Sequence, residues 1–251
     1  MSSELQAKVK KHWDNPSVES MYDKILIQKE INLIKSFIPE NTKILDAGCG
    51  EGEGTLQYAS IQGVKIDAVD YSETRLQKAR GNCNNVENIA FMKIDFLRDY
   101  ELDSDYDVII SQRFLINILD WEKQKKIILD LISHLKNDGI LILFEGSQDG
   151  VNRLNEFRGL FNLKPIEIKW HNRFFKDIEL ETFLKENNLK IIKKDSLSTF
   201  YFLTRGIKPI FEKDLNWNSQ FNSVSATKQV EDILALDDRF SRTKLWLILK
   251  K

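Results

Sequence analysis

Short apolar runs alternate with stretches of helical period along the first two thirds of the chain. The leading stretch, residues 21–37, places apolar residues at helical spacing and is followed by Pro39, which stops a helix. Five short runs rich in apolar and β-branched residues follow, at 43–47, 64–70, 88–95, 106–111 and 140–146. Between them, amphipathic helices begin near Gly54, Ser72 and Asp120. Such alternation predicts a doubly wound α/β fold with a mostly parallel sheet covered on both faces.

The pattern changes after Gly146. Residues 151–163 and 177–187 have helical period, whereas 164–175 show none. Residues 189–196 and 244–251 read as strands, and a polar interval lies between them. We expect one domain over 1–251, with an N-terminal helical cap (1–40), a core (41–146), an insertion (147–188) and a final, hairpin-like strand pair (189–251). The insertion after the fifth strand is a candidate lid.

Composition narrows the class of protein. The 251 residues are 42% hydrophobic and 30% charged, with 37 basic and 38 acidic side chains. Because the lysines are scattered among acids, the sequence predicts no nucleic-acid partner. The N-terminus lacks an apolar leader and no run approaches a membrane span, so we expect a cytoplasmic protein with no membrane contact. Cys49 and Cys83 have no metal-ligand spacing, which predicts reduced thiols and no metal site.

A glycine-rich corner follows the first predicted strand. Asp46, Gly48, Gly50 and Gly52 form a D-x-G-x-G-x-G pattern, in which missing Cβ atoms let the backbone turn tightly and approach a ligand. Glycines alone are weak evidence, and here they are out of register with the dinucleotide pattern G-x-G-x-x-G. Acids within the loop, such as Glu51, would repel a pyrophosphate and suit a cationic ligand. Asp46 either contacts that ligand or braces the loop.

Acidic residues also end the next two predicted strands. Asp70 ends the second, where a carboxylate can accept hydrogen bonds from both hydroxyls of a ribose. Asp95 and Phe96 end the third, where they can bind and cover an adenine edge. The alternative for each acid taken singly is a turn residue. Together, at the carboxyl ends of successive strands, they predict a nucleoside-binding edge.

On these residues the chain resembles the class I S-adenosylmethionine (SAM)-dependent methyltransferases. The resemblance is specific over Ile44–Leu143 and looser over the whole chain, whose final strand pair fits the family's seven-stranded Rossmann-like sheet. It implies that "DAGCGEG" (46–52) holds the methionine and sugar part of SAM, that S-adenosylhomocysteine is the product, and that "SQRF" (111–114) lies near the methyl group. The cofactor-binding residues implied are Asp46, Gly48, Cys49, Gly50, Gly52, Asp70, Tyr71, Asp95, Phe96 and Gln112.

Methyl transfer from a sulfonium needs close alignment, and a hydroxyl acceptor also needs a base. His171, in "IKWHNRFF", is the candidate base, although it is also explained as a structural histidine packed by Trp170 and Phe174. Arg113 is a candidate clamp for a phosphate or carboxylate of the acceptor, with a structural salt bridge as the alternative. Further candidate acceptor-binding residues are Tyr22 and Trp13, which would roof the pocket, Asn117, Glu145 and Asn172.

Two subclass signatures are missing. The amino-DNA methyltransferase motif after the fourth strand is replaced by "SQRF", which argues against base methylation. The acids of metal-dependent catechol-type enzymes are replaced by Ser111-Gln112 and Glu145-Gly146, which argues against a magnesium site. By elimination we expect a small-molecule acceptor. We also expect the protein to be a monomer or a homodimer.

The stretch from Ser111 to Lys126 is similar to that of bacterial methyltransferases that accompany surface-polysaccharide genes. This resemblance implies an oxygen of a sugar, a nucleotide-linked sugar or a phosphate-type metabolite as the acceptor. The alternatives are an amine acceptor, a non-catalytic regulatory protein that binds SAM, and a nicotinamide-dependent oxidoreductase.

Overall fold

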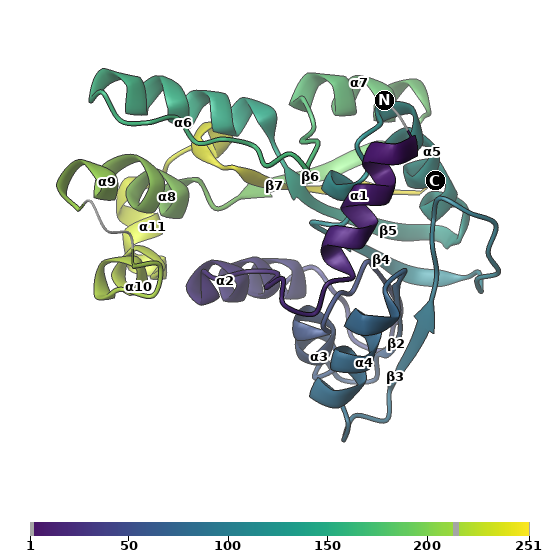
Figure 1. Cartoon of the computed structure of the whole chain (residues 1–251). Helices are drawn as coiled ribbons and strands as arrows, with labels where there is room; N and C mark the ends of the chain where they lie inside the picture. Colours follow the sequence, from purple (N-terminus) through teal and green to yellow (C-terminus); the bar gives the residue numbers. More distant parts are fainter. Residues whose placement is uncertain (1–2, 213–215, 251) are drawn as a thin grey trace.

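In the computed structural model, which describes residues 3–212 and 216–250, seven strands form one sheet in the order β3-β2-β1-β4-β5-β7-β6 (Figure 1). The strands are β1 (Lys43–Ala47), β2 (Lys65–Asp70), β3 (Ile89–Lys93), β4 (Tyr106–Gln112), β5 (Leu135–Gly146), β6 (Lys190–Ser196) and β7 (Thr243–Leu249). Only β7 runs antiparallel to its neighbours. The predicted fold class, a doubly wound and mostly parallel seven-stranded sheet, is confirmed.

Helices cover both faces of this sheet. They are α1 (Ser3–Trp13), α2 (Lys24–Lys35), α3 (Glu53–Tyr58), α4 (Glu73–Asn82), η1 (Leu115–Asn117), α5 (Trp121–Ser133), α6 (Gln148–Leu160), α7 (Asp177–Glu186), α8 (Ser198–Tyr201), η2 (Phe202–Ile207), α9 (Lys208–Phe211), α10 (Gln220–Ser225), α11 (Lys228–Leu234) and η3 (Asp238–Phe240). No helix within the described residues combines the length and the apolar character that a membrane span requires.

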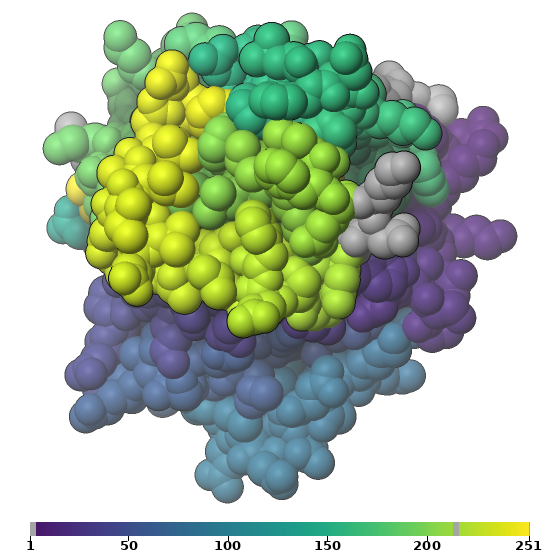
Figure 2. All heavy atoms as spheres, turned by 90° about the vertical axis from the view of Figure 1, so that its left-hand side faces the viewer, coloured from purple at the N-terminus to yellow at the C-terminus, as the bar shows by residue number. Residues whose placement is uncertain are grey.

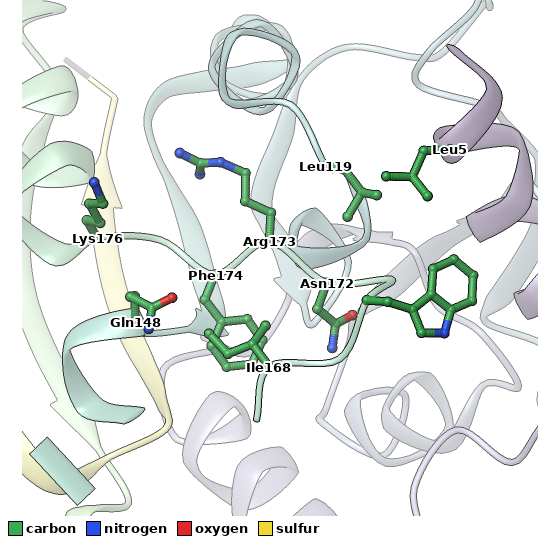
Figure 3. Close-up of a pocket in the computed structure, with 9 residues that line it drawn as sticks. Leu5, Leu119, Gln148, Ile168, Asn172, Arg173, Phe174 and Lys176 are labelled. Atoms are coloured by element: carbon green, nitrogen blue, oxygen red, sulfur yellow. The ribbon is translucent and has the colours of Figure 1, made fainter. Parts of the chain in front are cut away.

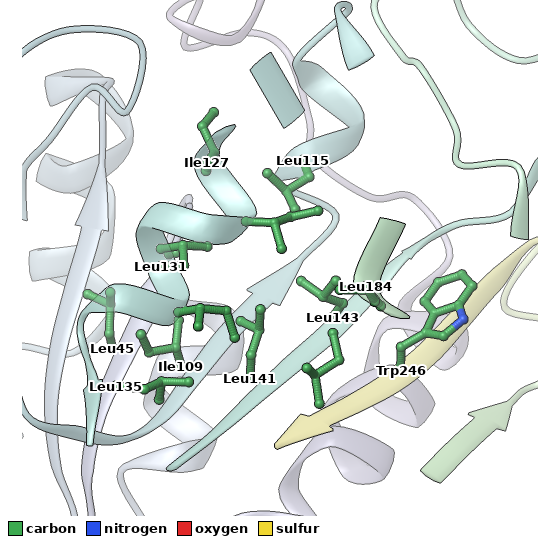
Figure 4. Packing of buried hydrophobic residues seen from close by; sticks show 14 of the residues in the cluster. Leu45, Ile109, Leu115, Ile127, Leu131, Leu135, Leu141, Leu143, Leu184 and Trp246 are labelled. Carbon is green, nitrogen blue, oxygen red and sulfur yellow. The ribbon is translucent and has the colours of Figure 1, made fainter. Parts of the chain in front are cut away.

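The central strands are apolar because alternate side chains enter two different cores. On one face, Leu45 and Ile109 pack against α5 through Ile127 and Leu131 (Figure 4). Asp120 begins α5, as expected, because its side chain accepts a hydrogen bond from the Lys123 N–H at 3.1 Å. On the other face, the neighbouring strand residues pack against α2 and α8. The sheet is therefore a rigid platform whose strand ends form one edge.

The connection between β6 and β7 differs from the prediction. The two strands do pair antiparallel. However, residues 197–242 are not a hairpin connection with a polar interval: their described part contains five short helices and one π-helix, η2. Figure 2 shows these helices as a layer beside α6 and above α2. Elements of three to seven residues are too short to show a helical period, which is why the sequence did not predict them.

Candidate functional site

The glycine corner has the backbone that its sequence predicts. Gly48, Gly50 and Gly52 have φ angles of +78°, +56° and +78°, in the left-handed region that favours glycine. A Cβ placed on Gly50 would meet no atom within 4 Å. The corner therefore leaves space beside its backbone at the carboxyl end of β1, where open α/β sheets bind ligands.

The corner is fastened to its neighbours on both sides. The N–H groups of Gly48 and Cys49 donate to the Val69 carbonyl of β2 at 2.8 and 3.0 Å. A Cβ on Gly48 would come within 2.6 Å of the Phe114 side chain. Only glycine therefore lets the loop after β4 lie against the corner.

Asp46 braces the corner from below. Its carboxylate is buried and accepts a hydrogen bond from the Thr55 hydroxyl of α3 at 2.6 Å. Burial raises the pKa of Asp46 to about 6. Among the two readings of this residue, the contact with Thr55 supports bracing, and a direct contact with the cofactor stays a prediction.

Asp70 lies at the edge of the space beside Gly50. One carboxylate oxygen accepts the Gly50 N–H at 3.1 Å and the other accepts the Ser72 N–H at 2.9 Å. Burial raises the pKa of Asp70, although the bonds from Ser72 and Gly50 and the charge of Arg75 oppose the shift. A carboxylate oxygen has two lone pairs, so both oxygens can still accept a hydroxyl donor. This geometry suits a ribose.

Asp95 and Phe96, which the sequence assigned to the adenine, lie at the same edge. Phe96 packs against Phe114, with ring centroids 5.2 Å apart, and against Tyr100 at 5.1 Å. Asp95 accepts the Leu97 N–H at 3.1 Å and forms an ion pair with Lys10 of α1. The N-terminal helix therefore reaches the carboxylate that the sequence assigned to the adenine.

The segment 3–20, here called the N-terminal cover, lies across the corner. Tyr71 donates its hydroxyl to the Lys10 carbonyl at 2.8 Å. The buried Arg75 of α4 donates to the carbonyls of Trp13 and Val18 at 2.9 and 2.7 Å. Sequence reasoning missed Arg75. The signal that could have found it is an acid in the glycine loop, Glu51, which pairs with it.

That pairing corrects the interpretation of Glu51. Its carboxylate forms ion pairs with Arg75 and, at 3.0 Å, with Lys78. Because both cations belong to α4, the charge of Glu51 is neutralised within the protein. It is therefore no evidence for a cationic ligand.

His171 lies where the insertion meets the N-terminal cover. Its ring stacks on His12 with centroids 4.5 Å apart and meets the edge of Trp13 at 5.2 Å. Burial and the neighbouring His12 lower the pKa of His171 to about 4, so its ring is neutral at pH 7. Its Nδ1 atom is buried without a hydrogen-bond partner. A proton-accepting role stays a prediction.

Arg113 follows β4 and pairs with the fully buried Glu30 of α2. Its Nε donates to Glu30 at 2.8 Å, a second guanidinium nitrogen pairs with the same carboxylate, and that nitrogen also donates to the Tyr201 hydroxyl at 3.3 Å. Although burial opposes it, the charge of Glu30 raises the pKa of Arg113. Gln112 also donates to Glu30, at 3.3 Å. These contacts support the salt-bridge alternative.

Three of the predicted acceptor-binding residues have surroundings that favour another role, and acceptor contact stays a prediction for them. Glu145 is fully buried, and its carboxylate accepts the Ser111 hydroxyl at 2.6 Å and three backbone N–H groups of residues 114–116. The side-chain oxygen of Asn117 accepts the indole N–H of Trp13 at 2.9 Å. Asn117 and Trp13 therefore attach the N-terminal cover to η1. Tyr22 is 65% exposed, which does not suit the roof of a pocket.

Asn172, by contrast, lines a surface pocket of about 450 Å³. In Figure 3, Leu5 and Leu119 lie on one side of this pocket, and the segment carrying Ile168 and Phe174 lies on the other. The side-chain oxygen of Asn172 is buried without a partner. The insertion and the N-terminal cover therefore line the same pocket.

Comparison with known proteins points to one family. A family model described as "Methyltransferase domain" matches residues 38–196, which is more than half of the chain. A malonyl-[acyl-carrier protein] O-methyltransferase of Bacillus anthracis is 33% identical over 114 residues, 45% of this chain and 40% of that protein. A ubiquinone biosynthesis O-methyltransferase of Rickettsia typhi is 27% identical over 162 residues, 59% of this chain and 60% of that protein. The chain thus spans about half the length of these relatives.

Solved structures share the fold. Magnesium protoporphyrin IX methyltransferase of Synechocystis, crystallised with S-adenosylhomocysteine, has a TM-score of 0.60 at 16% identity, covering 98% of this chain and 96% of that one. Phosphoethanolamine N-methyltransferase 1 of Haemonchus contortus has a TM-score of 0.65 at 16% identity, covering 99% of this chain and 50% of that one.

Proposed function

This chain belongs to the methyltransferase-domain family, and from that premise we propose that it transfers a methyl group from SAM to an oxygen atom of a small-molecule acceptor. The observation that carries the proposal is the placement of Asp70. Its carboxylate accepts the Gly50 N–H beside a space that no side chain fills. Two solved structures that share the fold, both of magnesium protoporphyrin IX methyltransferase, contain the methyl donor or its product.

In this proposal, different residues at the edge contact different parts of the cofactor. The backbone at Gly48–Gly52 offers close approach, Asp70 offers acceptors to ribose hydroxyls, and Asp95 with Phe96 offers a polar and an aromatic contact to the adenine. When bound, SAM supplies a methyl group on a sulfonium centre. The protein then has to align the acceptor oxygen with that methyl group and exclude water.

The N-terminal cover supports this exclusion of water. Arg75, Asn117 and Asp95 attach it to three different elements around the corner. His171 lies at its far side with a neutral ring and a free Nδ1 lone pair or proton. We propose it as the residue that accepts the proton of a hydroxyl acceptor, whereas a carboxylate or phosphate acceptor needs no such step.

The acceptor class is an oxygen-bearing polar metabolite, with a sugar, a nucleotide-linked sugar or a phosphate-type compound as candidates. Two relatives carry the name O-methyltransferase, which supports oxygen over an amine. The names of the relatives do not support a role in polysaccharide biosynthesis, and that association forms no part of the proposal.

The test is to incubate the protein with SAM and separate pools of sugar nucleotides, phosphates, carboxylates and amines, and to follow methylated products by mass spectrometry. We expect product from an oxygen acceptor. Binding of S-adenosylhomocysteine with no product from any pool would favour a regulatory SAM-binding protein instead.

Asp70→Asn gives the test of the cofactor site. Hydrogen bonds to a charged group contribute about 1.5–3 kcal/mol, so we expect affinity for S-adenosylhomocysteine to fall roughly tenfold to a hundredfold by calorimetry. Asp99→Asn, at an exposed position after β3, is the matched control and should bind as the wild type does. Equal affinity of the Asp70 variant would remove this residue from the site.

A further inference from the structure

Four buried side-chain nitrogen or oxygen atoms lack a hydrogen-bond partner within residues 3–212 and 216–250: His171 Nδ1, Asn172 Oδ1, Arg205 Nη1 and Arg242 Nε. Buried polar atoms in proteins are nearly always paired, so an unpaired group asks for an explanation. Two of these atoms are guanidinium nitrogens, which carry positive charge. Unpaired buried cations are costly for a fold unless an anion joins them.

The two arginines come from distant parts of the chain. Arg242 directly precedes β7, and its carbonyl accepts the Ser147 N–H at 2.8 Å. The next residue, Thr243, pairs with Gly146 at the carboxyl end of β5. Arg242 therefore lies at the same edge of the sheet as the glycine corner and the loop after β4.

Arg205 lies on the π-helical segment η2. It forms an ion pair with the buried Asp23, and its guanidinium lies 4.0 Å from the ring centroid of Trp217. Insertions of the π type are rare and occur often at functional sites. A second nitrogen of the same guanidinium, Nη1, is the unpaired one.

Tyr201 lies between these residues and Arg113. The Arg205 guanidinium is 5.9 Å from the Tyr201 ring centroid, and the Tyr201 hydroxyl lies 3.1 Å from the hydroxyl of Thr243, the residue after Arg242. Burial lowers the pKa of Arg242, and the charges of Arg113 and Arg205 lower it further. Arg113 already pairs with Glu30, and Arg205 already pairs with Asp23. Arg242 forms no ion pair within the described residues, although the charge of Glu30 raises its pKa. The three arginines therefore carry one positive charge more than the two acids that pair with Arg113 and Arg205.

Arg242 lies beside one residue that lines the surface pocket. Its guanidinium lies 5.4 Å from the ring centroid of Phe174, a residue of the insertion that also lines the surface pocket. Its charge also contributes to lowering the pKa of His171. Arg242 is thus close to both the candidate base and the pocket beside it.

We propose that Arg242 and Arg205 form a subsite that binds an anionic group, a carboxylate or a phosphate, of the methyl acceptor. This inference rests on the proposed function and narrows its acceptor to an acidic metabolite. A guanidinium is planar and presents paired donors, which match two oxygens of a carboxylate or phosphate. The anion would pair with the donors that the fold leaves unpaired at the edge where the methyl group is transferred.

The experiment measures thermal unfolding with inorganic phosphate or malonate as the probe, at constant ionic strength and with saturating S-adenosylhomocysteine. Two variants are compared with the wild type: Arg242→Gln, which removes the unpaired charge, and Arg205→Lys, which keeps the partner of Asp23 charged. Arg239→Gln is the matched control, because Arg239 lies three residues before Arg242, is 62% exposed and pairs with Asp237.

We expect one of the probes to raise the unfolding temperature of the wild type and of the control. Arg242→Gln should weaken that probe by about tenfold or more, since a charge-assisted bond is lost. Which probe acts tells a phosphate-bearing acceptor from a carboxylate-bearing one. Without any probe, Arg242→Gln should unfold at a higher temperature than the wild type, because an unpaired buried charge is gone. A merely structural arginine would give the opposite sign.

Two results with the folded proteins would overturn the subsite. One is equal stabilisation of all four proteins, which reports bulk ions. The other is a wild type that neither probe stabilises. If Arg242→Gln does not fold, its pairing in the native protein is shown and the subsite is likewise wrong. Calorimetry with S-adenosylhomocysteine on the same wild-type sample separates the two proposals: cofactor binding without anion binding removes only the subsite, and no cofactor binding removes the proposed function.

Discussion

At the scale of single residues, Glu145 shows how a carboxylate at a strand end is used for support. It ends β5 beside Gly146, and the sequence therefore suggested contact with a ligand. The side chain instead accepts the Ser111 hydroxyl and the N–H groups of Phe114, Leu115 and Ile116. These N–H groups begin η1, so Glu145 fixes the loop that packs on the glycine corner.

The charge state of Glu145 makes stability depend on pH. Burial raises its pKa from 4.5 to about 7, although the bonds from Ser111 and the backbone oppose the shift. A raised carboxyl pKa contributes stability that is fully present below pH 4.5 and is lost as the pH rises through about 7. We expect the free energy of unfolding to fall by about 2–3 kcal/mol from this group between pH 4.5 and 8.

Urea unfolding at several pH values checks this. Glu145→Gln does not titrate, so its unfolding free energy should lack that decline, at a general cost of about 1–3 kcal/mol from mispaired donors. Glu122→Gln, at a position with a 76% exposed side chain, should keep the decline. The same pH dependence in the Glu145 variant would show that another group is responsible.

At the scale of elements, the N-terminal cover joins the cofactor side of the edge to the acceptor side. α1 crosses the strand ends in Figure 1 and contacts three structurally separate regions. Lys10 reaches Asp95 after β3, Trp13 reaches Asn117 in η1, and His12 stacks on His171 in the insertion. Because one helix makes all three contacts, its attachment and the shape of the site are coupled.

The pKa of His171 reports whether the N-terminal cover is packed against the insertion, which is here called the closed form. Burial and His12 lower its pKa to about 4, so the closed form is supported above the ordinary histidine pKa of 6.5 and loses that support as the pH falls through about 4. NMR titration should find that low value in the wild type. Trp13→Ala removes an aromatic neighbour and hydrates the ring, which should raise the pKa toward 6.5.

Lys8→Gln is the matched control on the same helix, since the side chain of Lys8 is 64% exposed, and its variant should titrate like the wild type. A wild-type His171 that titrates near 6.5 would mean that the cover is open in solution.

The helices of residues 197–242 contact α2 and the core beside the sheet, although the sequence did not predict them. Lys29 of α2 donates to Glu231 of α11 at 2.6 Å and to the Ala226 carbonyl at 2.9 Å. Phe200 and Tyr201 of α8 enter the core beside the sheet. This segment carries Arg205 in η2 and Arg242 directly before β7.

At the scale of the whole molecule, a ligand that binds only the folded state stabilises all of it. S-adenosylhomocysteine at a hundred times its dissociation constant adds about 2.7 kcal/mol. For a chain of this size each kcal/mol raises the unfolding temperature by about 2–4 °C, so we expect a rise of roughly 5–11 °C. NAD at equal concentration should give no rise, because the corner lacks the glycine register of a dinucleotide site. A rise with NAD alone would favour the oxidoreductase alternative.

The sequence by itself determined the α/β fold and which strand ends share one edge of the sheet with the glycine corner. Strand and helix periods report local burial, and the carboxyl ends of parallel strands must share one edge, so Gly50, Asp70 and Asp95 could be brought together from chain order alone.

Only the tertiary structure decided which charges meet. Glu51 with Arg75, Glu30 with Arg113, and Asp23 with Arg205 are contacts between elements whose packing no local pattern encodes. The physical reason is that a charged side chain pairs with whatever the packing of distant elements brings within a few ångströms, whereas a backbone period depends on adjacent residues.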